Sequence, residues 1–593
     1  MTLFPLVASL NFLTTTTYSG YVLSSLLYWT VYPYATNANG SLYWNDSITN
    51  VVTHNANYTQ WQFHVTPGLK WSNGQNVTGQ DILNTYSSNF ALNSTYDLVN
   101  VAPEIASSSL VNSSTAQFNL NASDAHFAER ISMMIFDNVQ PPASIAQGPG
   151  SSLFNQSVNV GPFYLGKPYT SGDFELIFYR NPYYSPKPAA CELDVNLVES
   201  TSQITQYLSS GTTDIAGSID PSSVSADLKN PNIHILDEKS LNIMTMQYNV
   251  TVYPYNMTAF RQALVYSIDQ SQIQSQALFG YGTTAYNSEG IVPPNQNQLF
   301  NPNQQQYSYN TTKALQLLGT IGITKGTDGL LHYSNGTAVT LNLITDSEQT
   351  FDVVAAGLVK SELSNLGFTV NFQTISSQTI TGDFPSNANG IQQAMILYTS
   401  IGGTFFPNAW IDSTQGCHAY LLSYGVGCNY WEYPPSADAQ YNSNKSAIDN
   451  TSDPAQVNHY LANIQALNAQ YLPVIVLNYP DNLYAYNTQH WTGWPSRFFY
   501  AGSWLNTTAL AALQPASANA SGSTSLPTTS SSASSSTPST STSSAASTSS
   551  TSATSSSSST SISLNYAAVV IVVMIVITAA LFLRRGRAIK PAG

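Results

Sequence analysis

The segment Trp61–Leu83, WQFHVTPGLKWSNGQNVTGQDIL, carries the signals of a strand, a tight turn and a helix start within one short stretch. Apolar and polar residues alternate at its beginning, which is typical of a strand with one buried face. Asn73-Gly74 predicts a tight turn, and Thr78 lies three residues before Asp81, a spacing that resembles a capping box. The positions that we expect to be buried are Trp61, Phe63 and Val65 in the strand and Ile82, Leu83 and Tyr86 in the helix. The segment has no obvious nucleophile, metal site or phosphate loop.

Signals of the same kind alternate helices with strands through the rest of the body. Asp269 is expected to cap a helix that ends at Gly280. The helix before it places Phe260, Leu264 and Ile268 at a spacing of four, which is typical of a helix with one apolar face. The predicted helices are 258–268, 269–280, 312–318 and 352–366, and the predicted strands are 174–179 and 338–343. This mixture, without an internal repeat, predicts the α/β class.

The composition limits the kinds of partner. A chain of 593 residues is too long for one hydrophobic core, which predicts two or three lobes with appendages. Hydrophobic residues make up 42% of the chain, enough for globular cores, whereas charged residues make up only 8%. With 17 Lys and Arg against 31 Asp and Glu, the protein could not neutralise a run of phosphates. We therefore expect no nucleic-acid partner.

The end of the chain predicts a membrane anchor. Residues 566–583, YAAVVIVVMIVITAALFL, are uncharged and long enough to cross a hydrocarbon core. They predict a transmembrane helix at 564–583, with a buried core helix as the competing interpretation. The basic tail 584–593 is then expected in the cytoplasm and the N-terminal body outside the cell, in a cell membrane that the chain crosses once. Residues 518–563 are almost wholly Ser, Thr and Ala, which predicts a disordered stalk because they bury little apolar surface.

Three other features bear on an extracellular body. Asn-x-Ser/Thr sequons predict a glycoprotein, unless the Asn- and Ser-rich composition produces them by chance. They include Asn39, Asn57, Asn76, Asn249, Asn310 and Asn444. Met1–Leu13 has no basic region and no clear cleavage site, so we expect the true start, with its export signal, to lie upstream. Cys417 and Cys428 would make a plausible disulfide, which leaves Cys191 over.

These segments, in this order, resemble the family 5 extracellular solute-binding proteins of ABC importers, of the oligopeptide- and dipeptide-binding type. Trp61–Leu83 is similar to a strand, turn and helix of that family. The other stretches that resemble its motifs are NVGPFYL at Asn159–Leu165, RNPYY at Arg180–Tyr184, AFRQALVYSIDQSQI at Ala259–Ile273, VPP at Val292–Pro294, Thr312–Leu318 and Asp453–Val476. The matches span most of Leu10–Leu505, and the stalk and anchor are similar to those of archaeal members.

The resemblance implies a bilobal periplasmic-binding-protein-like clamp of type II, cluster C, with a small inserted third domain. Lobe I would comprise residues 1–54, 160–250 and 474–510, the insert residues 55–159, and lobe II residues 251–473. Trp61–Leu83 would then be scaffold within the insert. Family members normally begin with a further strand before the segment that Leu10–Thr14 resembles, which supports a true start upstream, and losing that strand would leave an unpaired sheet edge.

The resemblance also bears on the ligand. Peptide-binding members carry an acidic residue four places before a Pro, where it meets the α-ammonium of the ligand, and Gly403 stands at that position here. Because an unpaired ammonium in a closed cleft is costly, a neutral ligand becomes more attractive. Members that bind oligosaccharides use aromatic platforms. Together with Gly403, the candidate binding residues are Tyr398, Phe405, Phe406, Trp410 and Trp431, although each aromatic residue could instead belong to the core or the surface. Oligopeptide recognition through backbone hydrogen bonds stays open.

The expected function is therefore that of a membrane-anchored extracellular substrate-binding protein of an ABC importer. It would close two lobes over an oligopeptide or oligosaccharide and deliver it to a permease in the same membrane. We expect a monomer that needs no cofactor or metal and has no catalytic residues.

Two alternatives compete with this interpretation. A secreted hydrolase would need a nucleophile with a base, a carboxylate pair or a metal site. We interpret Asp237-Glu238 as a solvated turn, Arg261 and Asp269 as helix-surface and N-cap residues, and His54 and His64 as lacking a third metal ligand. A surface-layer or adhesion protein would also explain the stalk, the sequons and the anchor, but predicts repeated β-rich modules.

Overall fold

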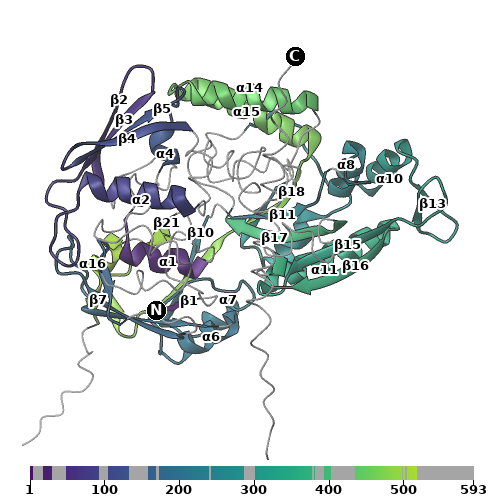
Figure 1. Ribbon diagram of the computed structural model, residues 1–593. Helices are drawn as coiled ribbons and strands as arrows, with labels where there is room; N and C mark the ends of the chain where they lie inside the picture. Colours follow the sequence, from purple (N-terminus) through teal and green to yellow (C-terminus); the bar gives the residue numbers. More distant parts are fainter. Residues whose placement is uncertain are drawn as a thin grey trace, which may run out of the picture. The chain divides into compact units, whose positions relative to one another are not determined.

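The computed structural model describes residues 1–3, 18–29, 48–92, 104–131, 158–167, 173–198, 200–239, 242–250, 252–285, 301–376, 379–380, 393–401, 435–496, 499–500, 504–505 and 507–516. The chain divides into two compact units, residues 1–519 and 520–593, and every described residue belongs to the first unit (Figure 1). The predicted transmembrane helix and tail, and the predicted stalk, therefore lie outside the described residues. Among the helices of the described part, none is long and apolar enough to cross a membrane.

A seven-stranded sheet holds the first residues of the chain in its interior. Its order is β10 (Ile233–Glu238), β19 (Asn482–Asn487), β9 (Ile215–Ala216), β1 (Thr2–Leu3), β8 (Glu192–Leu197), β7 (Glu175–Arg180) and β6 (Phe163–Leu165). β1 runs parallel to both of its neighbours, and the amino group of Met1 donates to the Asp194 carbonyl at 2.8 Å. β1 precedes the segment Leu10–Thr14 and is paired on both sides, so it leaves no unpaired edge at this point of the sheet. Helices α1 (Tyr18–Leu27), α6 (Thr201–Ser209) and α7 (Val224–Asp227) accompany the sheet, and α16 (Thr507–Ala512) contributes Leu510 to its core.

A second, six-stranded sheet has its own core. Its order is β12 (Gly282–Thr284), β18 (Ile475–Pro480), β11 (Asn242–Gln247), β17 (Met395–Ile401), β15 (Thr340–Asp346) and β16 (Thr369–Ile375). β15 lies parallel to β16 and β17, whereas β11 lies antiparallel to β17 and β18. The strands predicted at 174–179 and 338–343 are confirmed as β7 and β15, each shifted by one to three residues.

Helices cover both faces of this second sheet (Figure 1). One face packs into a core with α8 (Thr258–Tyr266), α10 (Thr311–Thr320) and α11 (Thr350–Leu366). The other face packs on α14 (Pro435–Asp449) and α15 (Pro454–Tyr471), which lie against each other. Along β11, Met244 and Met246 join the first core and Ile243 joins the second, because successive side chains of a strand point to opposite faces. The helices predicted at 258–268, 312–318 and 352–366 are thus confirmed.

A third sheet contains the segment with which the sequence analysis began. Its order is β2 (Thr49–His54), β3 (Gln60–Val65), β5 (Thr115–Leu120) and β4 (Ile105–Asn112), and it is accompanied by α2 (Gly79–Leu92) and α4 (Phe127–Arg130). The six predicted apolar positions are all buried, and Gly74 has the positive φ of +88° that its tight turn needs. The amide and hydroxyl of Thr78 donate to the Asp81 carboxylate at 2.6 and 2.8 Å, which confirms the helix start. We call these elements the four-stranded unit.

The chain passes between the two larger sheets twice, at neighbouring points. It leaves the seven-stranded sheet after β10 and enters the other sheet at β11, and it returns between β18 and β19. The two passages are joined by hydrogen bonds from Lys239 to Asp481, at 2.6 Å, and from Asn242 to Asn482, at 2.7 Å. β11 and β18 belong to the six-stranded sheet although the predicted division at 250 and 474 assigned them to lobe I, because their apolar residues pack in its core.

Three expectations about polar residues have different outcomes. Asp269 caps its helix as predicted, accepting a hydrogen bond from the Ser271 amide at 3.0 Å. Arg261 is not a surface residue: its side chain is buried and donates to the carbonyls of Leu472 at 3.0 Å and Tyr255 at 2.7 Å. It caps the carbonyl end of α15, where a cation is favoured. Asp237-Glu238 is not a turn either, since both residues lie in β10 and pair with β19.

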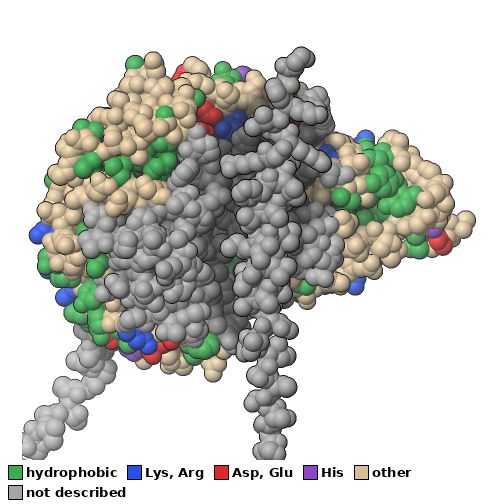
Figure 2. All heavy atoms as spheres, viewed as in Figure 1, with side chains coloured by type: hydrophobic (Ala, Val, Ile, Leu, Met, Phe, Trp, Pro, Cys, Tyr) green, Lys and Arg blue, Asp and Glu red, His purple; other side chains and the backbone are tan. Residues whose placement is uncertain are grey.

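Charged side chains are sparse on the described surface. Figure 2 shows scattered acidic and basic groups among a larger area of uncharged polar side chains and backbone. This agrees with the charged fraction of 8%.

Candidate functional site

The topology of the six-stranded sheet points to one edge as the candidate site. The parallel strands β15, β16 and β17 end at Asp346, Ile375 and Ile401, so their carboxyl ends meet at the same edge. In α/β sheets, ligands bind beyond the carboxyl ends of parallel strands. The chain that leaves β17 at this edge enters the segment in which the sequence placed the binding residues.

The same edge lies beside the passages between the sheets. Ile401, at the end of β17, pairs with Asn242, the first residue of β11. The Asn242 side chain in turn donates to Asn482, the first residue of β19. A group bound at the end of β17 would therefore lie within a few residues of both chain passages. A change in the angle between the two sheets would alter the contacts of that group.

Tyr398 is the one predicted binding residue that the described ranges contain. It lies in β17 between two residues that face the core with α11, Leu397 on one side and Thr399, which bonds to α11, on the other. The tyrosine therefore faces the opposite side of the sheet, where it packs partly buried against an apolar cluster. This cluster consists of Ile344, Ile375, Ile380, Ala394 and Ile396. Gly403, Phe405, Phe406, Trp410 and Trp431, and both Cys417 and Cys428, lie outside the described residues, and Cys191 is free and exposed.

The carboxylate of Asp352, on helix α11, holds the end of β17 in place through hydrogen bonds. Asp352 lies in the first turn of α11, is fully buried, and accepts hydrogen bonds from the Thr399 amide at 2.9 Å and hydroxyl at 2.6 Å. Burial raises the pKa of Asp352 to about 7, although the two hydrogen bonds from Thr399 oppose the shift. Sequence reasoning recognised the helix that starts here, but had no signal for the contact with Thr399, 47 residues away.

An ion pair joins the two chain passages beside the site. Lys239 lies 2.6 Å from Asp481 and 4.0 Å from Asp237, and the Asp481 side chain is only 3% exposed. Burial raises the pKa of Asp481 to about 6, against the opposing effect of the Lys239 hydrogen bond. The sequence analysis considered Asp237 only as half of an acidic pair, and did not find its proximity to Lys239 and Asp481.

The two histidines considered as metal ligands have other partners. His64 lies 3.1 Å from the Thr115 hydroxyl, and His54 contacts the Asn55 carbonyl at 2.9 Å. Within the part of the chain that the structure describes, no three His, Cys, Asp or Glu side chains are grouped so that they could hold a metal ion.

Comparison with known proteins finds a family whose model matches this chain, and solved structures that share its fold. Residues 44–418 match the model of the bacterial extracellular solute-binding proteins, family 5 Middle. The di/tripeptide-binding protein 1 of Pseudomonas aeruginosa is 23% identical over 314 residues, which are 51% of this chain and 54% of that protein. The first three curated relatives are matched over 39%, 54% and 66% of their lengths, so the chain spans about half the length of the curated relatives it matches.

Two solved structures show the likeness over a larger share of the chain. The protein NikZ of Campylobacter jejuni, in complex with Ni(L-His), has a TM-score of 0.72 at 18% identity over 86% of this chain and 98% of its own. A periplasmic oligopeptide-binding protein of Thermotoga maritima with mannohexaose bound has a TM-score of 0.69 at 16% identity, over 87% and 98%. At these identities the likeness shows the fold, which is the predicted α/β periplasmic-binding-protein-like fold.

Proposed function

Because this chain belongs to the family 5 extracellular solute-binding proteins, we propose that it captures a solute outside the cell and delivers it to the permease of an ABC importer. The observation that carries this proposal is the arrangement at the end of β17. There the candidate binding edge, the start of β11 and the start of β19 lie together, linked by Asn242. A solute held at this edge would favour one angle between the sheets, and that difference in affinity is what drives closure.

The ligand that we propose is an oligosaccharide, with an oligopeptide as the alternative. Gly403 stands where an acidic residue would pair with the α-ammonium of a peptide, and the aromatic ring of Tyr398, five positions earlier in the sequence, packs on an apolar cluster. An aromatic face on an apolar support suits the apolar face of a sugar ring. Both ligand classes occur in the names of similar proteins, as di/tripeptide and as mannohexaose.

Thermal unfolding with panels of ligands tests the proposal. Maltodextrins, β-glucans, free peptides and N-acetylated peptides are compared at equal concentration, and each ligand is analysed afterwards by mass spectrometry. We expect the melting temperature to rise with one class of oligomer, and the ligand to be recovered unaltered. Cleavage of the ligand would support the secreted hydrolase instead, and the absence of any shift would favour the surface-layer or adhesion protein. A shift confined to peptides with a free amino group would identify the oligopeptide alternative.

The location and modification of the protein are part of the same proposal. We propose that residues 564–583 anchor the body to the outer face of a cell membrane through the stalk at 518–563, with the tail 584–593 in the cytoplasm, as in archaeal members. Glycans would be carried by exposed sequons such as Asn57, Asn76 and Asn310, but not by Asn249, which is 7% exposed. Extraction of the protein by detergent but not by salt, and glycopeptide mapping, test these points.

The division into lobes and the disulfide are also proposals. We propose a monomeric clamp whose lobes are the two larger sheets with their helices and whose insert is the four-stranded unit, which moves β11 and β18 to lobe II and β2 to the insert relative to the predicted bounds. Peptide mapping without reduction tests whether Cys417 and Cys428 are joined, and light scattering tests the monomer.

A further inference from the structure

The turn between α14 and α15 forms a polar contact with the four-stranded unit. The Ala125 amide donates to the Asp449 carbonyl at 2.7 Å, His126 Nε2 lies 2.9 Å from the Thr451 carbonyl, and the hydroxyls of Tyr58 and Ser452 lie 2.8 Å apart. Since α14 and α15 pack on the six-stranded sheet, these bonds connect that sheet to the four-stranded unit. We call them the 449–452 contact.

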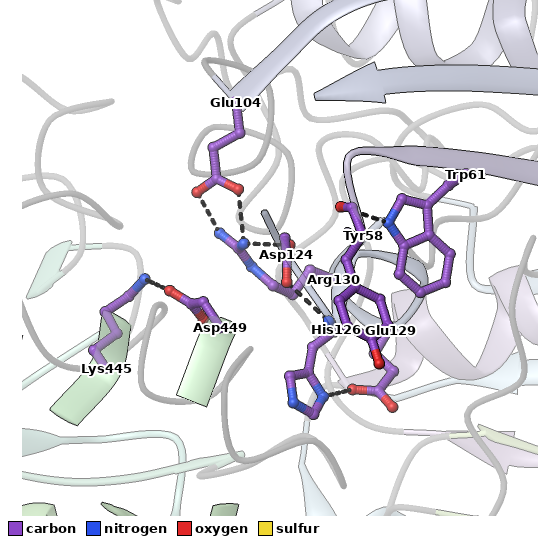
Figure 3. A network of polar contacts seen from close by, with 9 residues as sticks. All are labelled: Tyr58, Trp61, Glu104, Asp124, His126, Glu129, Arg130, Lys445 and Asp449. Carbon is purple, nitrogen blue, oxygen red and sulfur yellow. Dashed lines mark hydrogen bonds and ion pairs between the residues drawn. The ribbon is translucent and has the colours of Figure 1, made fainter. Parts of the chain in front are cut away.

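The contact requires a particular protonation state of His126. Its Nδ1 lies 2.8 Å from the Glu129 carboxylate (Figure 3), and its Nε2 lies 2.9 Å from the Thr451 carbonyl. The Thr451 carbonyl can only accept a hydrogen bond, and the same is true of Glu129 when its carboxylate is ionised. A neutral imidazole has one N–H and could satisfy one of them, whereas the imidazolium ion satisfies both. The geometry around the ring is therefore that of a charged histidine, and its side chain is only 15% exposed.

The charges that face this site are predominantly negative. Arg130 is buried and pairs with Asp124 at 2.6 Å and with Glu104 at 2.8 Å, and Lys445 pairs with Asp449 at 3.1 Å. With Glu129 the neighbourhood contains four carboxylates and two cations, so a proton on His126 reduces the imbalance. Burial on its own lowers the pKa of His126, but the hydrogen bond and charge of Glu129, with the charge of Asp124, raise this pKa above its ordinary value.

The backbone beside the contact is held in an uncommon conformation. Tyr58 has a φ of +52°, in the left-handed region that non-glycine residues rarely adopt. Its amide donates to the Asn55 carbonyl at 3.1 Å, and the Asn55 side chain accepts from the next amide, that of Thr59, at 2.9 Å. These bonds hold the turn from which the Tyr58 hydroxyl reaches Ser452.

We propose that the 449–452 contact is a proton-dependent latch, in which doubly protonated His126 joins the four-stranded unit to the α14–α15 turn and loss of the proton weakens the join. Since the pKa of His126 is raised in the folded protein, its stabilising effect is complete at acidic pH and is lost as the pH rises through that pKa. A role for the opening of this contact in releasing the solute rests on the proposed function. The latch itself can be tested without a ligand.

The exchange of single amide hydrogens tests the latch directly. The Ala125 amide has its acceptor across the contact, whereas the Leu120 amide donates to Thr59 within the four-stranded unit and serves as an internal control. We measure exchange in the ligand-free protein at pH 5 and pH 8 and divide each rate by the intrinsic rate. We expect protection at Ala125 to fall about tenfold at pH 8, the size of effect that a hydrogen bond from a charged group has on an equilibrium, and protection at Leu120 to stay constant.

Three variants assign the effect to His126. His126→Gln can still donate to Thr451 but does not titrate, so we expect its Ala125 protection to be independent of pH. Glu129→Gln removes the negative charge beside Nδ1 but keeps an amide oxygen that can accept its hydrogen, and the loss of the charge should move the transition to lower pH. The matched control is His64→Gln, a histidine of the same unit that contacts Thr115 instead of the turn, and it should behave as the wild type.

Several outcomes would overturn the latch. Equal Ala125 protection at both pH values in the wild-type protein would do so, and so would a pH dependence that persists in His126→Gln, which would point to Asp124. If His126→Gln does not fold, an NMR titration of the wild-type imidazole replaces it. A His126 pKa at or below the ordinary value, or one that differs from the midpoint of the Ala125 transition, would then contradict the proposal.

Discussion

Asp352 binds Thr399 twice, accepting its amide hydrogen at 2.9 Å and its hydroxyl hydrogen at 2.6 Å. The first turn of α11 is thereby tied to β17, one residue after Tyr398 and two residues before the strand ends. No cation lies beside this buried carboxylate among the residues that the structure describes, and a buried charge without a partner is costly, so the two hydrogen bonds from Thr399 are what stabilise it. Asp352 thus positions the strand that enters the candidate binding segment.

Replacing Asp352 tests this positioning role. In Asp352→Asn, one of the two acceptors becomes a donor that faces Thr399, and we expect the free energy of unfolding in urea to fall by about 1–3 kcal/mol at neutral pH. The pKa of Asp352 is raised to about 7, so its favourable contribution is complete below pH 4 and is lost as the pH rises to about 7. The loss of stability in Asp352→Asn should therefore be larger at pH 5 than at pH 8. An equal loss at both pH values would contradict the assignment, and Thr399→Ser, which keeps both donors, is the matched control.

The ion pair at the chain passages should depend on pH in a related way. Lys239→Gln leaves Asp481 buried without its ammonium partner, and we expect a loss of about 1 kcal/mol in unfolding free energy, limited by the exposure of Lys239. Asp481, with a pKa raised to about 6, is protonated at pH 5 and charged at pH 8, so the loss should be larger at pH 8. Lys325→Gln, an exposed lysine of the short strand β13 (Thr324–Lys325), is the control. If the loss is the same at both pH values, Lys239 does not stabilise the folded protein through the charge of Asp481.

Arg261 should be one of the most sensitive positions of the six-stranded sheet. In Arg261→Met the Tyr255 and Leu472 carbonyls lose the buried guanidinium, although the Tyr248 hydroxyl still donates to Leu472, and we expect the protein to lose about 3 kcal/mol of unfolding free energy. Arg261→Lys restores a charge but not the planar set of donors, so it should recover only part of the loss. Urea denaturation measures both variants. If Arg261→Met unfolds at the same urea concentration as the wild type, the capping of α15 by this side chain is not important for stability.

Tyr398 should contribute to solute binding through its ring. Tyr398→Ala removes an aromatic face from the edge at the end of β17, and we expect the dissociation constant of the solute found by thermal screening to rise at least tenfold, about 1.4 kcal/mol. Tyr398→Phe keeps the ring and should bind more tightly than Tyr398→Ala. Isothermal titration calorimetry measures both, with Tyr309→Ala, an exposed aromatic residue next to the start of α10, as the control. Wild-type affinity in Tyr398→Ala would exclude this tyrosine from the site.

Features that depend on neighbouring residues could be predicted from the sequence. The strand, turn and helix of Trp61–Leu83, the capping pair of Thr78 and Asp81, and the N-cap at Asp269 all follow from local spacing, because their partners lie within a few residues. The order of such segments along the chain was also sufficient to recognise the family, which the match over residues 44–418 confirms.

Contacts between distant residues were decided by the tertiary structure alone. Arg261 was expected at the surface, because only the folded chain brings it to the carbonyls of Leu472, 211 positions away. His126 meets Thr451 across 325 positions. No spacing in a sequence indicates such pairs, since the burial that makes a charge costly, and the acceptor that stabilises it, both arise when the sheets and helices pack together.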